Sequence, residues 1–435
     1  MAKDNLVVGI DVGTSKVTTA IASIEEHKIN VIGVSTIPSK GLRKGQVVNI
    51  EEAVENVSQS LEAAERMAGA SVASAYVSLG GVHIASQNSK GVVAVAEPDK
   101  EIIDDDVRRV IEASRAISLP SVREILHAVP RHFIVDSQDG IADPTGMTGV
   151  RLEVDTHIIT SSSTASRNLA KCIEELGVSV NGLVFSGLAS SYAVLTDTEK
   201  ELGVVLIDIG GGTTDVCVFV EGSLAYSAVI PVGARNITND LAIGLRISLE
   251  SAEKIKLALG KKPKTPVYPE ERSHEKTKKD EVNKDELDFS ELNLSEGLKK
   301  ISRRTLIEGI IKPRLIELFT LVGLELQKSG AGGQTPAGIV ITGGGAETIG
   351  VVETCKQRLS LPVRLGYPTG VSGLIDELEG LQNSTCVGLL LYGIRDDSRE
   401  RRGRTMLTSF GGFTAKLPLK GIAKKLSDLI KSFMP

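Results

Sequence analysis

Residues 204 to 219, VVLIDIGGGTTDVCVF, interrupt an apolar run with two aspartates, three glycines and two threonines. Glycine inside a strand pattern marks a place where another group approaches the backbone, because no side chain stands in the way. The N–H donors of such a turn suit an anion, and the carboxylate of Asp208 suits the anion's metal ion. The stretch therefore predicts two buried strands joined by a tight hairpin that binds a nucleotide phosphate with magnesium.

A second stretch near the N-terminus repeats this plan. Residues 6 to 22, LVVGIDVGTSKVTTAIA, place Asp11 after an apolar strand and follow it with Gly13, two hydroxyl residues and Lys16. One such turn could be an ordinary strand connection, whereas two copies in one chain indicate two similar halves. We expect both hairpins to bind one polyphosphate in a shared cleft, with Asp11 and Asp208 on opposite sides of the metal.

A third glycine cluster follows the strand predicted at residues 339 to 342. Gly343, Gly344 and Gly345 come directly after this strand and before a helix predicted over residues 349 to 359. Such a turn lets a flat purine lie against the backbone, although it is equally a structural connection. In this order the three stretches resemble the phosphate-1, phosphate-2 and adenosine motifs of the actin-like ATPase superfamily. That resemblance implies an α/β fold, the two-lobed, ribonuclease-H-like duplicated actin fold.

The composition is that of a globular protein with several domains. At 435 residues the chain is expected to form two to four domains of roughly 100 to 200 residues. Its 41% hydrophobic and 24% charged residues exclude global disorder. With 3% aromatic residues, no tryptophan and a net charge of -5, the chain lacks the features of a nucleic-acid-binding surface, so we expect no nucleic-acid partner.

Several kinds of site and location are excluded by missing motifs. The four cysteines lie far apart without a C-x-x-C pair, which predicts buried thiols in a reducing compartment and no zinc site. The sequence has no H-E-x-x-H spacing and no nucleophile elbow. Charged residues precede the first strand, and no apolar run reaches the roughly 20 residues of a membrane span. We therefore expect a cytoplasmic protein with at most a peripheral membrane attachment.

Changes of composition along the chain predict an insertion and a surface loop. After the first hairpin and a helix at residues 50 to 68, residues 83 to 157 consist of short strands and one charged helix before the first half resumes. We interpret them as an inserted small subdomain. Residues 261 to 286 are rich in lysine, glutamate and proline, so we expect a mobile surface loop, with a partner-binding loop as the alternative.

Longer stretches resemble the FtsA family of actin-like bacterial cell-division proteins. They are GLASSYAVLTDTEKELGVVLIDIGGGTTD, SAEKIK, SRRTL with the following IIKPR, and SGAGGQTPAGIVITGGGAETIG. The resemblance covers nearly the whole chain. It implies an ATP-binding protein that forms filaments with itself on the cytoplasmic face of the bacterial membrane at midcell. There it would anchor the ring of the tubulin-like protein FtsZ and help to assemble the divisome.

The resemblance also implies a subdomain organisation. Residues 83 to 157 would take part in filament contacts and bind later divisome proteins. The implied segments are a first actin-like half (1 to 82, 158 to 200 and about 370 to 395), the inserted subdomain (83 to 157), a second half (201 to 235 and about 300 to 369), a second small subdomain (236 to 299), a flexible linker (396 to 418) and an amphipathic helix (419 to 435).

Site residues follow from the resemblance residue by residue. Asp11 and Asp208 would hold Mg²⁺, and Glu253 and Lys256 would lie at the ribose and base, with a solvated helix face as the alternative for these two. The FtsZ C-terminal peptide would bind near Arg303, Arg304 and Glu308. The remaining ATP-binding residues would be Gly13, Thr14, Ser15 and Lys16 in the first hairpin, Gly210, Gly211, Gly212, Thr213 and Thr214 in the second, and Gly343, Gly344 and Gly345 at the adenosine.

Hydrolysis of ATP is not predicted. Hydrolytic actin-like ATPases tend to place Gln or Glu just before the helix that corresponds here to LASSYAVL, but this sequence has Phe185, Ser186 and Gly187 there. Serine is a poor general base at neutral pH, so we expect ATP binding with a weak or absent ATPase activity.

The last segment, LKGIAKKLSDLIKSFMP, predicts an amphipathic helix. It is too short to span a bilayer but suits an interface with anionic lipids, to which its lysines are attracted. The charged residues 395 to 414 resemble a tether, which favours membrane attachment over the alternative of a helix packed on the protein body. The residues expected to contact the membrane are Ile422, Leu426, Leu429, Ile430 and Phe433 on the apolar stripe, with Lys424 and Lys425 beside it.

Two other functions remain as alternatives. The actin-like adaptor of type IV pilus assembly shares the expected fold and insertion, but it would not be expected to carry this tail. An actin-fold sugar or acid kinase would need a catalytic base and a polar substrate pocket, and the sequence offers no residue for either.

Overall fold

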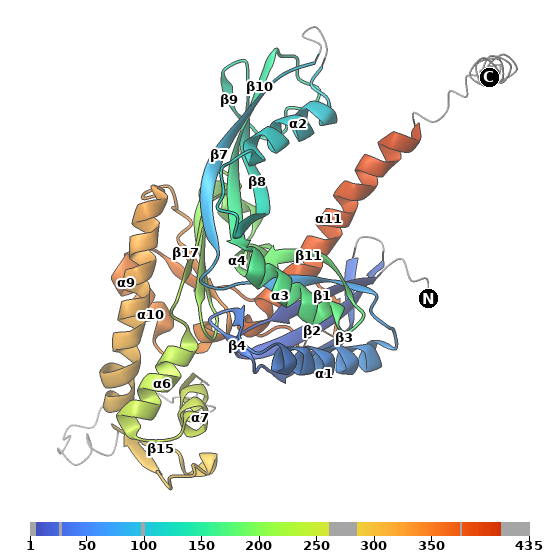
Figure 1. Ribbon diagram of the computed structural model, residues 1–435. Helices are drawn as coiled ribbons and strands as arrows, with labels where there is room; N and C mark the ends of the chain where they lie inside the picture. The colour runs from blue at the N-terminus through green and yellow to red at the C-terminus, as the bar shows by residue number, and fades with distance from the viewer. Residues whose placement is uncertain (1–5, 26–27, 97–100, 261–284, 375, 410–435) are drawn as a thin grey trace, which may run out of the picture. The chain divides into compact units, whose positions relative to one another are not determined.

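The computed structural model describes residues 6 to 25, 28 to 96, 101 to 260, 285 to 374 and 376 to 409. The chain divides into two compact units, Met1–Gly393 and Ile394–Pro435. The first unit contains two large sheets and a smaller inserted one, with helices packed against them (Figure 1).

The first large sheet has the strand order β11, β6, β1, β2, β3, β19. Strands β1 and β2 pair antiparallel with Asp11 opposite Thr18, whereas β1 and β6 are parallel. Stretches that lie far apart in the sequence therefore share one sheet. Its strands are β1 Leu6–Val12, β2 Lys16–Glu25, β3 Lys28–Pro38, β6 Ser74–Leu79, β11 Ser179–Phe185 and β19 Ser372–Gly373, and a small hairpin beside it pairs β4 Leu42–Arg43 with β5 Gln46–Val47.

Helix α1, Ile50–Ala68, covers one face of this sheet (Figure 1). The Asn49 side chain caps its first turn, and Gly69 ends it in the left-handed conformation. A Cβ on Gly33 would lie 2.4 Å from the Ala64 carbonyl oxygen, so glycine permits the close approach of helix and sheet. The other helices of this half are α3 Ser163–Glu174, α4 Ser186–Val194 and α5 Asp197–Leu202.

The inserted subdomain is an antiparallel sheet in the order β7, β10, β8, β9, with helix α2, Asp104–Arg115, against it (Figure 1). Val110 of α2 packs among buried side chains that include Phe133 and Leu152. The last strand runs on to Ser162, beyond the boundary predicted at residue 157, because it continues directly into α3. The strands are β7 Ala85–Ala94, β8 Arg123–Val135, β9 Gln138–Ile141 and β10 Arg151–Ser162.

This subdomain forms hydrogen bonds with both halves. Toward the second half, Ser86 Oγ donates to the Ser227 carbonyl oxygen (2.6 Å), and His157 Nε2 hydrogen-bonds the Ser227 hydroxyl (2.9 Å). Toward the first half, the Phe185 N–H donates to His127 Nε2 (2.9 Å) at the start of α4. Burial lowers the pKa of His127 to about 4, so this ring is neutral and can accept the bond at neutral pH.

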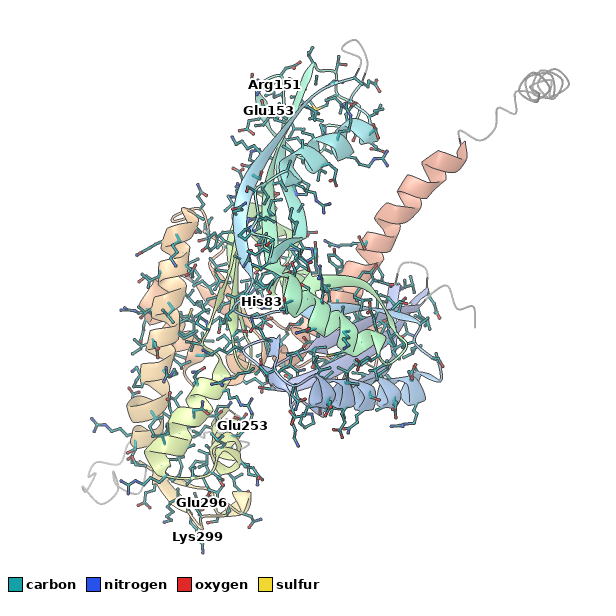
Figure 2. The ribbon with its side chains drawn as sticks, viewed as in Figure 1. His83, Arg151, Glu153, Glu253, Glu296 and Lys299 are labelled. Atoms are coloured by element: carbon teal, nitrogen blue, oxygen red, sulfur yellow. The ribbon has the colours of Figure 1, made fainter. Side chains whose placement is uncertain are left out.

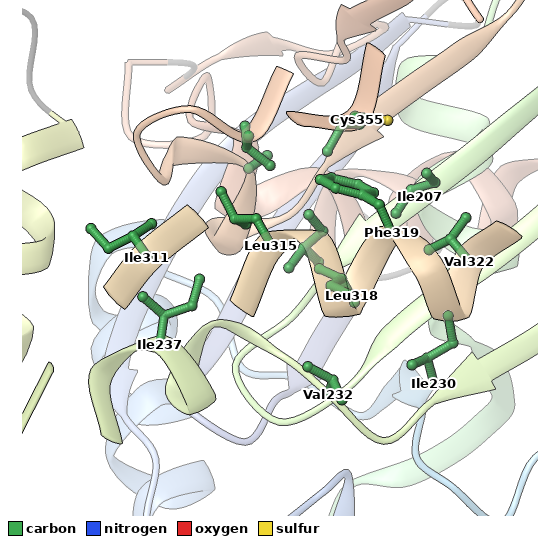
Figure 3. Packing of buried hydrophobic residues seen from close by; sticks show 14 of the residues in the cluster. Ile207, Ile230, Val232, Ile237, Ile311, Leu315, Leu318, Phe319, Val322 and Cys355 are labelled. Carbon is green, nitrogen blue, oxygen red and sulfur yellow. The ribbon is translucent and has the colours of Figure 1, made fainter. Parts of the chain in front are cut away.

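The second large sheet has the order β14, β13, β12, β17, β18. Strands β12 and β13 pair antiparallel with Asp208 opposite Asp215. Helix α9, Lys312–Ser329, buries Leu315 and Phe319 against this sheet (Figure 3). The remaining elements are β12 Val204–Ile209, β13 Thr214–Val220, β14 Ser223–Ile230, β17 Ile339–Thr342, β18 Val363–Leu365, the short 3₁₀ turn η4 Gly344–Glu347 and α10 Val351–Leu359.

A second small subdomain extends from this half. Strands β15, Glu286–Asp288, and β16, Lys300–Ser302, form one hairpin, so this small subdomain runs to Ser302, just past the boundary predicted at about residue 300. Most of the predicted mobile loop, residues 261 to 284, lies outside the described residues. The other elements are α6 Ala234–Leu245, α7 Leu249–Gly260, η2 Ser290–Leu292 and a π-helix, η3 Thr305–Ile311.

Helix α11, Ser384–Ser409, follows the 3₁₀ turn η5, Leu381–Asn383, and extends past the end of the first unit. The flexible linker predicted from residue 396 is therefore wrong up to Ser409. Arg, Glu, Met and Leu favour helix, and no proline interrupts the stretch. The predicted amphipathic helix at residues 419 to 435 lies outside the described residues. Within the part of the chain that the structure describes, no helix is long and apolar enough to cross a membrane.

Candidate functional site

A cleft of about 620 Å³ brings the three glycine clusters together. The residues predicted to bind ATP line it, with the exception of Thr214. Thr214 is fully buried, and its hydroxyl donates to the Val232 carbonyl oxygen (2.8 Å), so it fixes the start of β13 instead of facing the cleft. Polar lining residues that sequence reasoning did not assign are Ser39, Ser186, Asp215, Arg235, Thr238, Glu250, Glu347, Gln382 and Thr385.

The two hairpins have the same turn. Gly13 N–H donates to the Lys16 carbonyl oxygen and Gly210 N–H to that of Thr213, both at 2.9 Å. The tips meet across the cleft, because a Cβ on Gly211 would lie 2.0 Å from Ser15 Oγ. The backbone N–H groups nearest the two tips make no backbone hydrogen bond among the described residues, whereas the N–H groups of Gly13 and Gly210 do. The tip donors belong to Thr14, Ser15, Gly211 and Gly212.

Asp11 is held within the first half. Ser78 Oγ donates to its Oδ1 (2.7 Å), and Lys16 lies beside it. Burial raises the pKa of Asp11, and the attraction of the Lys16 charge and the Ser78 hydrogen bond oppose this rise. Burial lowers the pKa of Lys16, whose Nζ donates to the hydroxyl of Thr18 (3.0 Å). The first hairpin thus offers a half-buried cation next to its carboxylate.

Asp208 is held by elements of the first half, although it belongs to the second sheet. The Ser190 hydroxyl of α4 and the Thr385 hydroxyl of α11 donate to its Oδ2. Burial raises the pKa of Asp208 to about 6. Gly343 has φ +82°, and a Cβ there would lie 2.2 Å from Asp208 Oδ1. The first glycine of the third cluster is therefore needed to make room for this carboxylate.

Asp215 is the carboxylate to which the sequence pattern gave no role. It lines the cleft, is 6% exposed, and its Oδ1 has no hydrogen-bond partner among the described residues. Burial raises its pKa well above the usual range, and the nearby charges of Asp208 and Asp11 add to the rise. Its position opposite Asp208 in the hairpin was the signal that could have revealed it.

These residues fit a hydrated magnesium ion on a polyphosphate. Asp11, Asp208 and Asp215 are three buried carboxylates whose negative charges lie close enough to repel one another. The Oδ1 atom of Asp215 has no hydrogen-bond partner among the described residues. Mg²⁺ binds oxygen ligands and keeps several of its waters. In the described part of the chain, no group of three or more His, Cys, Asp or Glu side chains is arranged so that it could hold a metal ion.

Glu253 and Lys256 lie in the cleft wall on α7, where Figure 2 labels Glu253. Lys256 Nζ donates to Glu253 (2.7 Å) and to the hydroxyl of Thr238 on α6 (2.9 Å). Lys256 is 9% exposed, so the alternative of a solvated helix face is wrong for this residue. Leu249 and Leu257, about half exposed, line the same wall and offer an apolar surface that sequence reasoning missed.

The predicted peptide-binding residues lie outside this cleft. Arg303, Arg304 and Glu308 are exposed where β16 passes into the π-helix η3. Glu308 pairs with Lys312 (2.8 Å), and the Arg304 N–H donates to Asp285 Oδ1 (3.0 Å). The predicted membrane-contacting residues, from Ile422 to Phe433, lie outside the described residues.

Two family models match the chain. The model described as "SHS2 domain inserted in FTSA" matches residues 81 to 160, and the model described as "Cell division protein FtsA" matches residues 205 to 388. The cell division protein FtsA of Pseudomonas aeruginosa is 39% identical over 431 residues, covering 98% of this chain and 97% of its own. The chain belongs to the FtsA family. Its relatives in this family include the FtsA proteins of Bacillus subtilis, 38% identical over 91% of this chain and 85% of that protein, and of Escherichia coli K12, 35% identical over 89% and 90%.

Solved structures show the fold of this FtsA-family chain. The "PilM-PilN type IV pilus biogenesis complex" matches with a TM-score of 0.63 at 15% identity, over 89% of this chain and 98% of that chain. Spiroplasma citri MreB5 bound to AMPPNP matches with a TM-score of 0.53 at 14% identity, over 92% and 100%. Together with the inserted domain, these matches confirm the predicted actin-like α/β fold.

Proposed function

We propose that this FtsA-family chain binds ATP with Mg²⁺ in the cleft, assembles into filaments, and anchors the FtsZ ring to the cytoplasmic face of the bacterial membrane at midcell. The observation that carries the nucleotide site is the contact of two equivalent hairpins, whose free N–H groups meet beside Asp11 and Asp208. MreB5, which shares the fold, is described as bound to AMPPNP and to ADP.

In this proposal each part of the cleft has one task. The tip N–H groups bind phosphate oxygens, Lys16 neutralises phosphate charge, and Asp11 and Asp208 hold the waters of the metal ion. Magnesium, when bound, neutralises charge between the phosphates. The ribose and base lie between α7 and the turn at Gly343 to Gly345, where Lys256 and Glu253 offer a donor and an acceptor.

The partners are proposed on separate surfaces. The exposed Arg303 and Arg304 suit an acidic peptide such as the FtsZ C-terminal peptide. The inserted subdomain is proposed to bind later divisome proteins, and the tail is proposed to bind anionic lipids, which filament formation strengthens through avidity. The likeness to PilM concerns the fold alone at 15% identity, so cell division is favoured over the pilus adaptor.

Co-sedimentation with anionic liposomes tests the membrane anchor. We expect the full chain with ATP and magnesium to pellet with vesicles of phosphatidylglycerol and phosphatidylethanolamine, and a truncation ending at Thr414 to stay in the supernatant. The double substitution Lys424→Glu and Lys425→Glu should weaken pelleting, because each lysine near an anionic surface contributes about 1 kcal/mol. Equal pelleting of the full and truncated chains, or none of either, would contradict the proposal.

A further inference from the structure

Among the described residues, three cationic side chains line the nucleotide cleft, and two of them already have partners. Lys16 Nζ donates to the side-chain oxygen of Asn383, just before α11. Lys256 Nζ donates to Glu253 (2.7 Å) on the same helix. The third cation, Arg235, is exposed, and its side chain forms no hydrogen bond or ion pair within the described part of the chain. Its charge is therefore available to a ligand in the cleft.

Arg235 lies in the first turn of α6, which rests on the tip of the second hairpin. The Arg235 N–H donates to the Gly211 carbonyl oxygen (2.9 Å). A Cβ on Gly233 would lie 2.7 Å from the carbonyl oxygens of Gly210 and Gly211, so glycine is needed for this close approach. The backbone of Arg235 is thereby fixed to the same tip whose free N–H groups are proposed to bind phosphate.

Helix geometry directs the Arg235 side chain toward this tip. Each Cα–Cβ bond of an α-helix tilts toward the helix N-terminus, and the N-terminus of α6 is the end that contacts the hairpin. One turn later on α6, Thr238 also lines the cleft. Thr238 hydrogen-bonds Glu253 and Lys256, where the ribose is proposed to lie. Along α6, Arg235 therefore marks the phosphate end of the cleft and Thr238 the ribose end.

We propose that the Arg235 guanidinium binds the terminal phosphate of ATP and makes the cleft select ATP over ADP, an inference that rests on the proposed nucleotide site. A guanidinium is always charged, and its fork of N–H donors fits two oxygens of one phosphate group. The terminal phosphate has three free oxygens and lies farthest from the ribose, at the end of the cleft that Arg235 marks. ADP lacks this phosphate, so it leaves Arg235 without a ligand.

The substitution Arg235→Gln tests this role, because it removes the charge and keeps a long polar side chain. Calorimetric titration of the full-length protein in magnesium measures its affinity for AMPPNP and for ADP. We expect the affinity for AMPPNP to fall about 10- to 100-fold, as for a lost charged hydrogen bond, and that for ADP to change less than about threefold. Arg235→Lys keeps the charge but not the fork, so it should lose only part of the AMPPNP affinity.

Arg246→Gln is the matched control. Arg246 is an exposed arginine at the other end of α6, outside the cleft lining, and its substitution should leave both affinities unchanged. Equal losses for AMPPNP and ADP in Arg235→Gln, no loss for either, or the same AMPPNP loss in Arg246→Gln would overturn the inference. These outcomes leave the proposed function standing if the wild type binds both nucleotides, whereas a wild type that binds neither would overturn the proposed function as well.

Discussion

The first hairpin, β1 to β2, and the second, β12 to β13, share their register and their turn hydrogen bond but not their surroundings. Asp11 is held by Ser78, so its contacts stay within the first half. Asp208 is held by Ser190 and Thr385, which come from the opposite half. The two hairpins therefore share a backbone conformation but differ in what their side chains do. The first hairpin places a positive charge in the cleft, and the second connects the two halves through side-chain hydrogen bonds.

The largest effect is expected from Gly343→Ala. Its Cβ would lie 2.2 Å from Asp208 Oδ1, and φ +82° strains any residue but glycine. Displacing this carboxylate should lower the affinity for Mg·ATP at least about 100-fold, or about 3 kcal/mol. Fluorescence titration measures this affinity. Gly344→Ala is the control, because a Cβ there meets Gln382 Cβ only at 3.4 Å, and equal losses in both variants would refute the clash.

The pH dependence of stability distinguishes the buried carboxylate of the second hairpin. The pKa of Asp208 in the folded protein is about 6 against 3.8 for an unperturbed group, so folding favours its protonated form. Stability from this group is present below pH 4 and is lost as the pH rises through 6. We expect Asp208→Asn to become more stable than the wild type, by about 3 kcal/mol at pH 7 and by nothing at pH 4, in urea unfolding without nucleotide. A difference that stays constant with pH would contradict this account.

A matched pair of substitutions compares the cationic hairpin with its neutral counterpart. Lys16 and Thr213 occupy equivalent positions, because each accepts the turn hydrogen bond of its hairpin. Lys16→Met keeps the aliphatic stem and should weaken ATP binding about 10- to 100-fold, as expected for a lost charged hydrogen bond. Thr213→Ala should weaken it less than about threefold. Calorimetric titration measures the ATP affinity of both variants. Equal losses of affinity would show that the two hairpins contribute equally to ATP binding.

The smallest effect concerns the contact of the two tips. Gly211→Ala would place its Cβ 2.0 Å from Ser15 Oγ, and because this oxygen can rotate away, we expect only about a three- to tenfold loss of ATP affinity. Adding Ser15→Gly should restore the affinity to that of Ser15→Gly alone. If the two losses simply add, the tips do not touch in solution.

Local patterns were enough to predict the architecture of the cleft. An aspartate, glycines and hydroxyl residues between apolar strands specify a tight hairpin wherever they occur, and two copies specify a duplicated fold. The structure therefore brings Gly13, Lys16, Gly210 and Gly343 to one cleft although more than 300 residues separate the first from the last. Helix α1 begins and ends where its sequence pattern predicted.

The features that were missed depend on contacts between distant segments. Nothing near Asp208 in the sequence indicates Ser190 or Thr385 as its partners. The unpartnered oxygen of Asp215 follows from strand pairing and from the approach of α4, and Thr214 turned away because the preceding turn directs it toward Val232. The linker was misjudged because a charged sequence without a core pattern can still form a helix, as α11 does up to Ser409.

Calorimetric titration of the full chain with AMPPNP, in magnesium and in EDTA, tests most directly whether the two hairpins form one nucleotide site. We predict one molecule bound per chain, at least about tenfold more tightly with magnesium, and loss of most of this difference in Asp208→Asn. A wild-type chain that binds no nucleotide, or binds it equally in EDTA, would contradict the account.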